Sequence, residues 1–220
     1  MALVIAKWSN VRVGIQSALG ADKAISAITK ANPATVSATA HGFTQADFIL
    51  MDDIEGMFQL DSRVFRVEAN ASPPDANSFS LESENSTLYD TFVSGNAKLV
   101  TFGTNMRSAV GLTANGGDST FLDATTIHDN IRKQIPGLPN AISYAFENIW
   151  DPADGALQAM KEASDNQAQR AIKFLFAGGQ VVVFSGFVDC TLLPLGTAQE
   201  IVKCNVTFTM NGRPTIYATS

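Results

Sequence analysis

Apolar and polar side chains alternate regularly near the C-terminal end of the chain. Cys204, Val206, Phe208 and Met210 are separated by polar residues. Because successive side chains of a β-strand point to opposite faces, the pattern predicts a strand over residues 201–211 with one buried and one polar face. Runs of the same texture predict further strands over residues 11–16, 141–149, 171–176 and 180–188.

One segment follows a helical period instead. Asp151 is a suitable N-cap, and Pro152 suits the first helical position. The apolar residues that follow fall three or four positions apart, as expected for one face of a helix. They are Ala153, Ala156, Leu157, Met160 and Ala163. The pattern predicts a single amphipathic helix that packs on a sheet.

Residues 26–100 have a different texture from the rest. Short strand-like runs are separated by glycine and proline turns about ten residues apart, which is typical of a small closed or curled β module. The sequence therefore predicts a mainly β fold with one packed helix and an inserted β-barrel-like domain at 26–100. Residues 1–25 and 101–220 would form the main domain, and the segment 114–118 (Ala-Asn-Gly-Gly-Asp) predicts a hairpin turn within it.

Charge is sparse and unevenly distributed. Charged residues make up 16% of the chain, against roughly 25% in an ordinary soluble domain. The segment 26–100 holds ten acids and four bases and so carries the whole net charge of −6. No basic groove for nucleic acid is indicated. A protein with so little charge often covers part of its surface with partners.

The two cysteines and the N-terminal residues bear on the compartment. Residues 1–5 are apolar but too few for a signal peptide, and no apolar run is long enough to span a bilayer. Synthesis in the cytoplasm is expected, with Cys190 and Cys204 as thiols. A symmetric hairpin about Thr197 would place them opposite one another. The favoured interpretation is two small buried apolar side chains.

Catalytic and metal-binding arrangements are not indicated. His41 and His128 are the only histidines, and they lack the short spacing of zinc ligands. There is no nucleophile elbow and no phosphate-binding loop. Asp123 and Asp129 flank a polar run, where paired carboxylates are usually solvated. We therefore expect no enzyme activity, no metal and no cofactor.

The second half of the chain resembles the tail tube (major tail) proteins of long-tailed phages. The resemblance is carried by residues 122–130 (LDATTIHDN), 134–138 (QIPGL) and 209–214 (TMNGRP), with the intervening strands and helix in the family's order. It implies a β-sandwich or partial barrel with one packed helix. It also implies a virion tail protein whose identical subunits form hexameric rings. Stacked rings would make a hollow tube through which DNA passes without specific binding. Further implied partners are the tape measure protein and the tail terminator and tip proteins.

The segment 26–100 resembles a small β module that is frequent in tailed-phage proteins. It is similar to one half of the catalytic-cysteine region of ubiquitin-activating enzymes. Residues 28–34 (ITKANPA), 40–43 (AHGF) and 54–57 (IEGM) carry the likeness. It implies a phage context but no ubiquitin chemistry. Because an outward insert would collide with a contractile sheath, we expect a non-contractile tail with the insert outside the tube.

Two sets of residues are predicted to serve assembly. The first would face the lumen: Glu147, Asp189 and Glu200. The second would make ring and stacking contacts: Asn115, Asp118, Asp123, His128, Arg132 and Lys133. The alternative function is another phage assembly role, as a capsid decoration protein, a tail terminator or a fibre or host-binding component.

Overall fold

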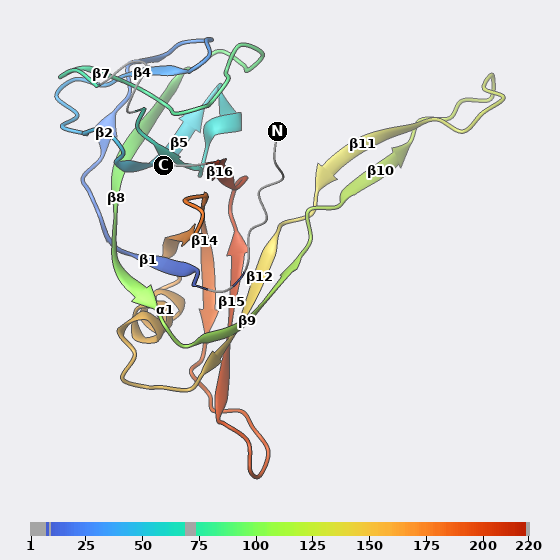
Figure 1. The fold of residues 1–220 in the computed structure, drawn as a ribbon. Helices are drawn as coiled ribbons and strands as arrows, with labels where there is room; N and C mark the ends of the chain where they lie inside the picture. Colours follow the sequence, from blue (N-terminus) through green and yellow to red (C-terminus); the bar gives the residue numbers. More distant parts are fainter. Residues whose placement is uncertain (1–7, 9, 69–73, 219–220) are drawn as a thin grey trace.

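The computed structural model describes residues 8, 10–68 and 74–218, so the expectation for residues 1–5 lies outside the described residues. The described chain is mainly β with one α-helix, as predicted (Figure 1). The helix, α1, spans Gly155–Asp165. The strands are β1 Arg12–Leu19, β2 Lys23–Ala24, β3 Ala27–Ile28, β4 Thr35–Ser37, β5 Phe48–Glu55, β6 Val64–Arg66, β7 Ser78–Ser80, β8 Ser94–Met106, β9 Ala109–Asn115, β10 Ser119–Asp123, β11 Gln134–Pro139, β12 Ser143–Ile149, β13 Gln169–Leu175, β14 Val181–Cys190, β15 Lys203–Met210 and β16 Thr215–Tyr217.

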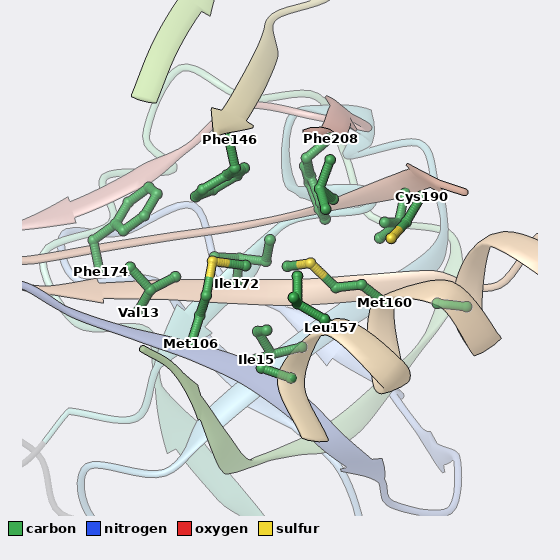
Figure 2. Packing of buried hydrophobic residues seen from close by; sticks show 14 of the residues in the cluster. Val13, Ile15, Met106, Phe146, Leu157, Met160, Ile172, Phe174, Cys190 and Phe208 are labelled. Atoms are coloured by element: carbon green, nitrogen blue, oxygen red, sulfur yellow. The ribbon is translucent and has the colours of Figure 1, made fainter. Parts of the chain in front are cut away.

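One 11-stranded sheet forms the body of the described chain. Its order is β6-β5-β8-β1-β13-β14-β15-β12-β9, with β2 added to β8 and β16 added to β14. The sheet curls into a half-barrel, which confirms the predicted partial barrel. A large core lies on one face of the sheet, where the rings of Phe146 and Phe174 are neighbours (Figure 2).

Helix α1 covers part of this core. Ala156, Leu157, Met160 and Ala163 are buried, so these four residues of the predicted apolar face are confirmed. The prediction for Ala153 is wrong, because this residue lies in the turn before the helix and is exposed. The predicted start is wrong by three residues, because Asp154 is the N-cap and its carboxylate accepts a hydrogen bond of 2.8 Å from the amide of Ala156.

Asp151, the N-cap expected from the sequence, stabilises the turn before the helix instead. The carboxylate of Asp151 accepts from the backbone N–H of Ala153 at 2.9 Å. Each aspartate therefore satisfies one backbone N–H, and the chain reverses before the helix begins.

The prediction that β1 has a polar face is also wrong. Gly14 and Gln16 are buried like their apolar neighbours, because both faces of the sheet are covered at this strand. The side chain of Gln16 is satisfied within the sheet, since its amide oxygen accepts from the backbone N–H of Ala171 at 2.9 Å. This hydrogen bond joins β1 to β13 directly beyond the last pair of their ladder, Ile15 with Ile172.

The segment predicted as an insert has its own apolar core and also shares the main sheet. Strands β3, β4 and β7 form a separate sheet over a cluster that includes Phe43, Phe65 and Phe79. Strand β8 crosses the predicted boundary at residue 100 and pairs with both β5 and β1. A third cluster joins Val64 of the segment to Val183 of β14. The division into two domains stays a prediction.

Candidate assembly surfaces

The face of β12, β15 and the end of β14 that points away from the core is mostly polar, although Ile149 and Phe187 are also exposed on it. Glu147 lies opposite Asn205, and Asp189 lies opposite Thr207, so these side chains share one face of the sheet. Glu147, Lys203 and Asp189 are the only charged residues of β9, β12, β14 and β15. This face therefore carries two carboxylates and one ammonium group, and its other residues are uncharged.

Two of the three predicted lumen residues lie on this polar face. Glu147 accepts a hydrogen bond from the ammonium group of Lys203 at 2.9 Å, and this bond raises the pKa of Lys203. Asp189 is exposed on the neighbouring part of the sheet. Glu200 lies apart from them, in the loop that joins β14 to β15.

A long hairpin, which we call the arm, leaves the body beside β9 and β12 (Figure 1). It comprises residues 118–139, with β10 and β11 as its two strands. The predicted hairpin turn at 114–118 is wrong, because the chain does not reverse there. Gly116 and Gly117 have φ values of +90° and +84°, and they let β9 bend into β10. A Cβ at Gly116 would lie 2.1 Å from the carbonyl oxygen of Ala141, so only glycine fits.

The tip of the arm is held by hydrogen bonds among its own side chains. Arg132 pairs with Asp123 at 2.9 Å, and Lys133 pairs with Asp129. Hydrogen bonds from Thr125 and then the Arg132 contact lower the pKa of Asp123. The contact with Lys133, followed by hydrogen bonds from Thr126, lowers the pKa of Asp129. These contacts give the arm an ordered tip.

The predicted contact residues all lie on the arm or at its base, and all are exposed. Asn115 ends β9, Asp118 begins the arm, and His128 lies in the tip. The structure therefore brings them together along one projection. It places Asp123, Arg132 and Lys133 in ion pairs within the arm, where the sequence alone had suggested contacts with a partner.

Sequence reasoning missed the apolar side chains of the arm. They are more than half exposed: Phe121 61%, Leu122 57%, Ile127 96%, Ile131 79%, Ile135 54% and Leu138 87%. Cross-strand pairing places Leu122 beside Ile135 on one face and Phe121 beside Pro136 on the other. The arm thus presents apolar groups on both of its faces, and such an exposed cluster marks an interaction surface.

The border of the sheet at β9 is unpaired among the described strands. Strand β9 forms a ladder with β12 on one side only. Its free side borders a groove of about 770 Å³, whose opposite wall is formed by β1 and the end of β8. Trp8 and Val110 contribute exposed apolar surface to the groove, the buried rings of Phe146 and Phe174 lie beneath it, and Arg107 contributes positive charge. An unpaired edge beside an apolar groove is suited to receiving another chain.

His41, Cys190 and Cys204, whose side chains could bind a metal or react, are parts of the buried core. His41 is buried between the rings of Phe43 and Phe79, and its Nδ1 accepts from the amide of Phe43 at 2.9 Å. Cys190 and Cys204 are buried free thiols, and burial raises the pKa of each. They do not lie opposite one another, because Cys190 pairs with Val206 in the hairpin.

No group of three or more metal-ligating side chains occurs among residues 8, 10–68 and 74–218. Within the same residues, no helix combines the length and the apolar composition needed to cross a bilayer.

Comparison with protein families gives one match. The model of the family described as phage tail tube protein (TTP) matches residues 55–219. The match covers most of the chain, including the arm, the polar sheet face and α1. It begins inside the segment predicted as an insert. No curated protein matches the chain.

Proposed function

Because the chain belongs to the phage tail tube protein family, we propose that it forms hexameric rings that stack into the hollow tail tube of a phage. Phage DNA would pass through this tube into the host. The family is a structural one, and the chain is a structural component of the phage tail. The observation that carries the proposal is a mostly polar sheet face that ends at β9, whose outer edge has no partner among the described strands.

Ring closure follows from the unfinished border of the sheet. The free N–H and C=O groups of β9 can be satisfied by the sheet of an identical neighbour. The arm and the groove occupy different parts of the same subunit, so contacts between copies would be head to tail. Contacts of that kind close into rings when the rotation allows, and rings then stack along an axis.

The polar face provides a suitable lumen wall. We assign Glu147 and Asp189 to the lumen, with Glu200 at one mouth of the tube. DNA binds strongly wherever lysine and arginine neutralise phosphates and release counterions. Acids outnumber bases on the face, and the one ammonium group, that of Lys203, is engaged by Glu147. Such a wall would let DNA slide.

The remaining parts of the proposal concern position and partners. The segment 26–100 would decorate the outside of a non-contractile, siphovirus-type tail. Asn115, Asp118 and His128 would contribute to contacts between subunits, together with Asp123, Arg132 and Lys133. The tube would enclose the tape measure protein and end at terminator and tip proteins. Synthesis and assembly would take place in the host cytoplasm, without any catalytic step or cofactor.

Electron microscopy of the purified chain tests this proposal. The protein is expressed alone, concentrated and examined in negative stain. Long hollow filaments of constant diameter are the expected result. Particles that remain monomeric or trimeric at all concentrations would instead support the alternative role of a capsid decoration protein, and the tube proposal would be abandoned.

A further inference from the structure

The arm and the groove are complementary parts of one chain that do not meet within it. In Figure 1 the arm projects away from the body. The groove is lined by residues of β9, β1 and the end of β8. We propose that the arm of one copy docks into the β1–β9 groove of a second copy. This inference rests on the proposed tube and names the contact that joins its subunits.

The arm exposes apolar side chains on both of its faces, and a partner must bury both. Leu122 and Ile135 form one apolar face, and Phe121 with Pro136 forms the other. A flat surface would bury only one of these faces. The groove has two walls, one from β9 and one from β1 and β8, so it can contact an inserted element on both sides.

The chemistry of the groove matches that of the arm. Among its aromatic lining residues, Trp8 is exposed, whereas Phe146 and Phe174 belong to the buried core beneath it. Trp8 is 62% exposed, although its ring contacts Phe174 with centroids 6.0 Å apart. Aromatic side chains in desolvated pockets supply much of the binding energy at protein interfaces. Phe121, at 61% exposed, is the aromatic residue of the arm and serves as its anchor.

Charge favours the arm over residues 1–7, another apolar segment, as the occupant of the groove. The groove lining contains Arg12 and Arg107 and no acid. Residues 118–139 hold three acids and two bases, so the arm is net negative. Residues 1–7 would add Lys7 and no acid to a positive groove. Opposite charges on the two surfaces favour the pairing of arm and groove and set its orientation.

A second exposed apolar surface offers a competing target. It lies in and beside the loop between β14 and β15, where Leu193, Leu195 and Ile201 are each about half exposed or more (63%, 49% and 65%). It carries no arginine or lysine between residues 191 and 202, and Glu200 adds a negative charge. An acidic loop is a poorer match for a negative arm, so we assign the arm to the groove.

Cysteine crosslinking of assembled full-length protein distinguishes the two targets. Leu138→Cys places a thiol on the arm, and Val110→Cys places one in the groove, where both residues are exposed. A short bismaleimide reagent is added to filaments of the double variant. A ladder of crosslinked dimers and higher multimers is expected, because each subunit would be joined to two neighbours.

Matched variants control for chance reactions. The wild-type cysteines are buried, so wild-type filaments should give no ladder. Leu138→Cys alone should give no species beyond dimers. A ladder from Leu138→Cys combined with Leu195→Cys, and none from the groove pair, would overturn the assignment. Filaments that form without any ladder from the groove pair would overturn it as well, whereas failure of the wild type to form filaments would refute the tube itself.

A second variant keeps the inference testable if the double variant does not fold. Phe121→Ala changes an exposed side chain and should leave the free subunit folded. We expect the protein concentration needed for assembly to rise about tenfold or more, as for the loss of an interface anchor. In a Trp150→Phe background, Trp8 fluorescence should become protected from acrylamide when the parent assembles. An unchanged assembly threshold for Phe121→Ala, or a Trp8 that stays fully quenched in filaments, would contradict the proposal.

Discussion

Strand β15 leaves no room for a side chain at Gly186 of β14, so a substitution at this glycine should destabilise the sheet. Gly186 lies opposite Met210 in the ladder. A Cβ built on Gly186 would lie 2.1 Å from the carbonyl oxygen of Thr209 and 2.8 Å from the ring of Phe208. Backbone atoms cannot move aside as a flexible side chain can. The substitution Gly186→Ala must therefore displace one strand of the central sheet.

Gly14 provides a matched control in the same sheet. It is also buried in a central strand, but a Cβ there would meet its nearest neighbours at 3.7 Å, an ordinary contact distance. Overpacking a core costs about 1–3 kcal/mol, whereas replacing a strand glycine by alanine returns roughly 0.5–1 kcal/mol. We expect Gly186→Ala to lower the free energy of unfolding by about 2 kcal/mol. Gly14→Ala should be neutral or stabilising.

Urea denaturation measures the difference. With an m-value of about 2 kcal/mol/M, the midpoint for Gly186→Ala should fall by roughly 1 M. The transition is followed at several protein concentrations, because assembly would make the apparent stability depend on concentration. Equal midpoints for the two alanine variants would refute the close approach of β14 and β15.

Two further predictions concern charged groups. Glu84 accepts hydrogen bonds from the buried Arg63 at 3.0 and 3.3 Å. Glu84→Ala should therefore lower the free energy of unfolding, measured in urea, by about 3–5 kcal/mol. The control Lys161→Ala removes an exposed ion pair with Asp165 and should change that free energy by less than about 0.5 kcal/mol. The pKa of Asp129 is lowered in the arm, so the hydrogen bond from the amide of Thr126 should persist above the ordinary aspartate pKa and be lost as the pH falls through the lowered value. An NMR titration of that amide should give a midpoint below about 3.9, and a midpoint at or above this value would contradict the assignment.

Much of the fold follows from periodicity. The alternation of Cys204, Val206, Phe208 and Met210 correctly predicts β15 and its buried face. The apolar face of α1 is equally clear, although Asp151 and Asp154 are both good N-caps and only the structure selects the second. Periodicity works here because each element has one face on a core and one face in solvent.

Periodicity predicts a segment less well where both faces of a strand are buried or both are exposed. Both sides of β1 are covered, so Gln16 is buried despite its polarity. Both sides of the arm are exposed, so Phe121 and Leu122 stand next to each other without a repeating pattern. A pattern of that kind looks like a loop in the sequence. Neither the groove nor the free edge of β9 could be predicted, because both depend on which strands are neighbours in space.

In the proposed tube, identical subunits complete a sheet whose mostly polar face lines a channel. A cryo-EM reconstruction of filaments formed by the purified chain measures this directly. We expect Glu147 and Asp189 on the inner wall, with a strand of the adjacent subunit hydrogen-bonded to the outer edge of β9. Filaments with the polar face on the outer surface, or with every β9 edge left unpaired, would contradict it.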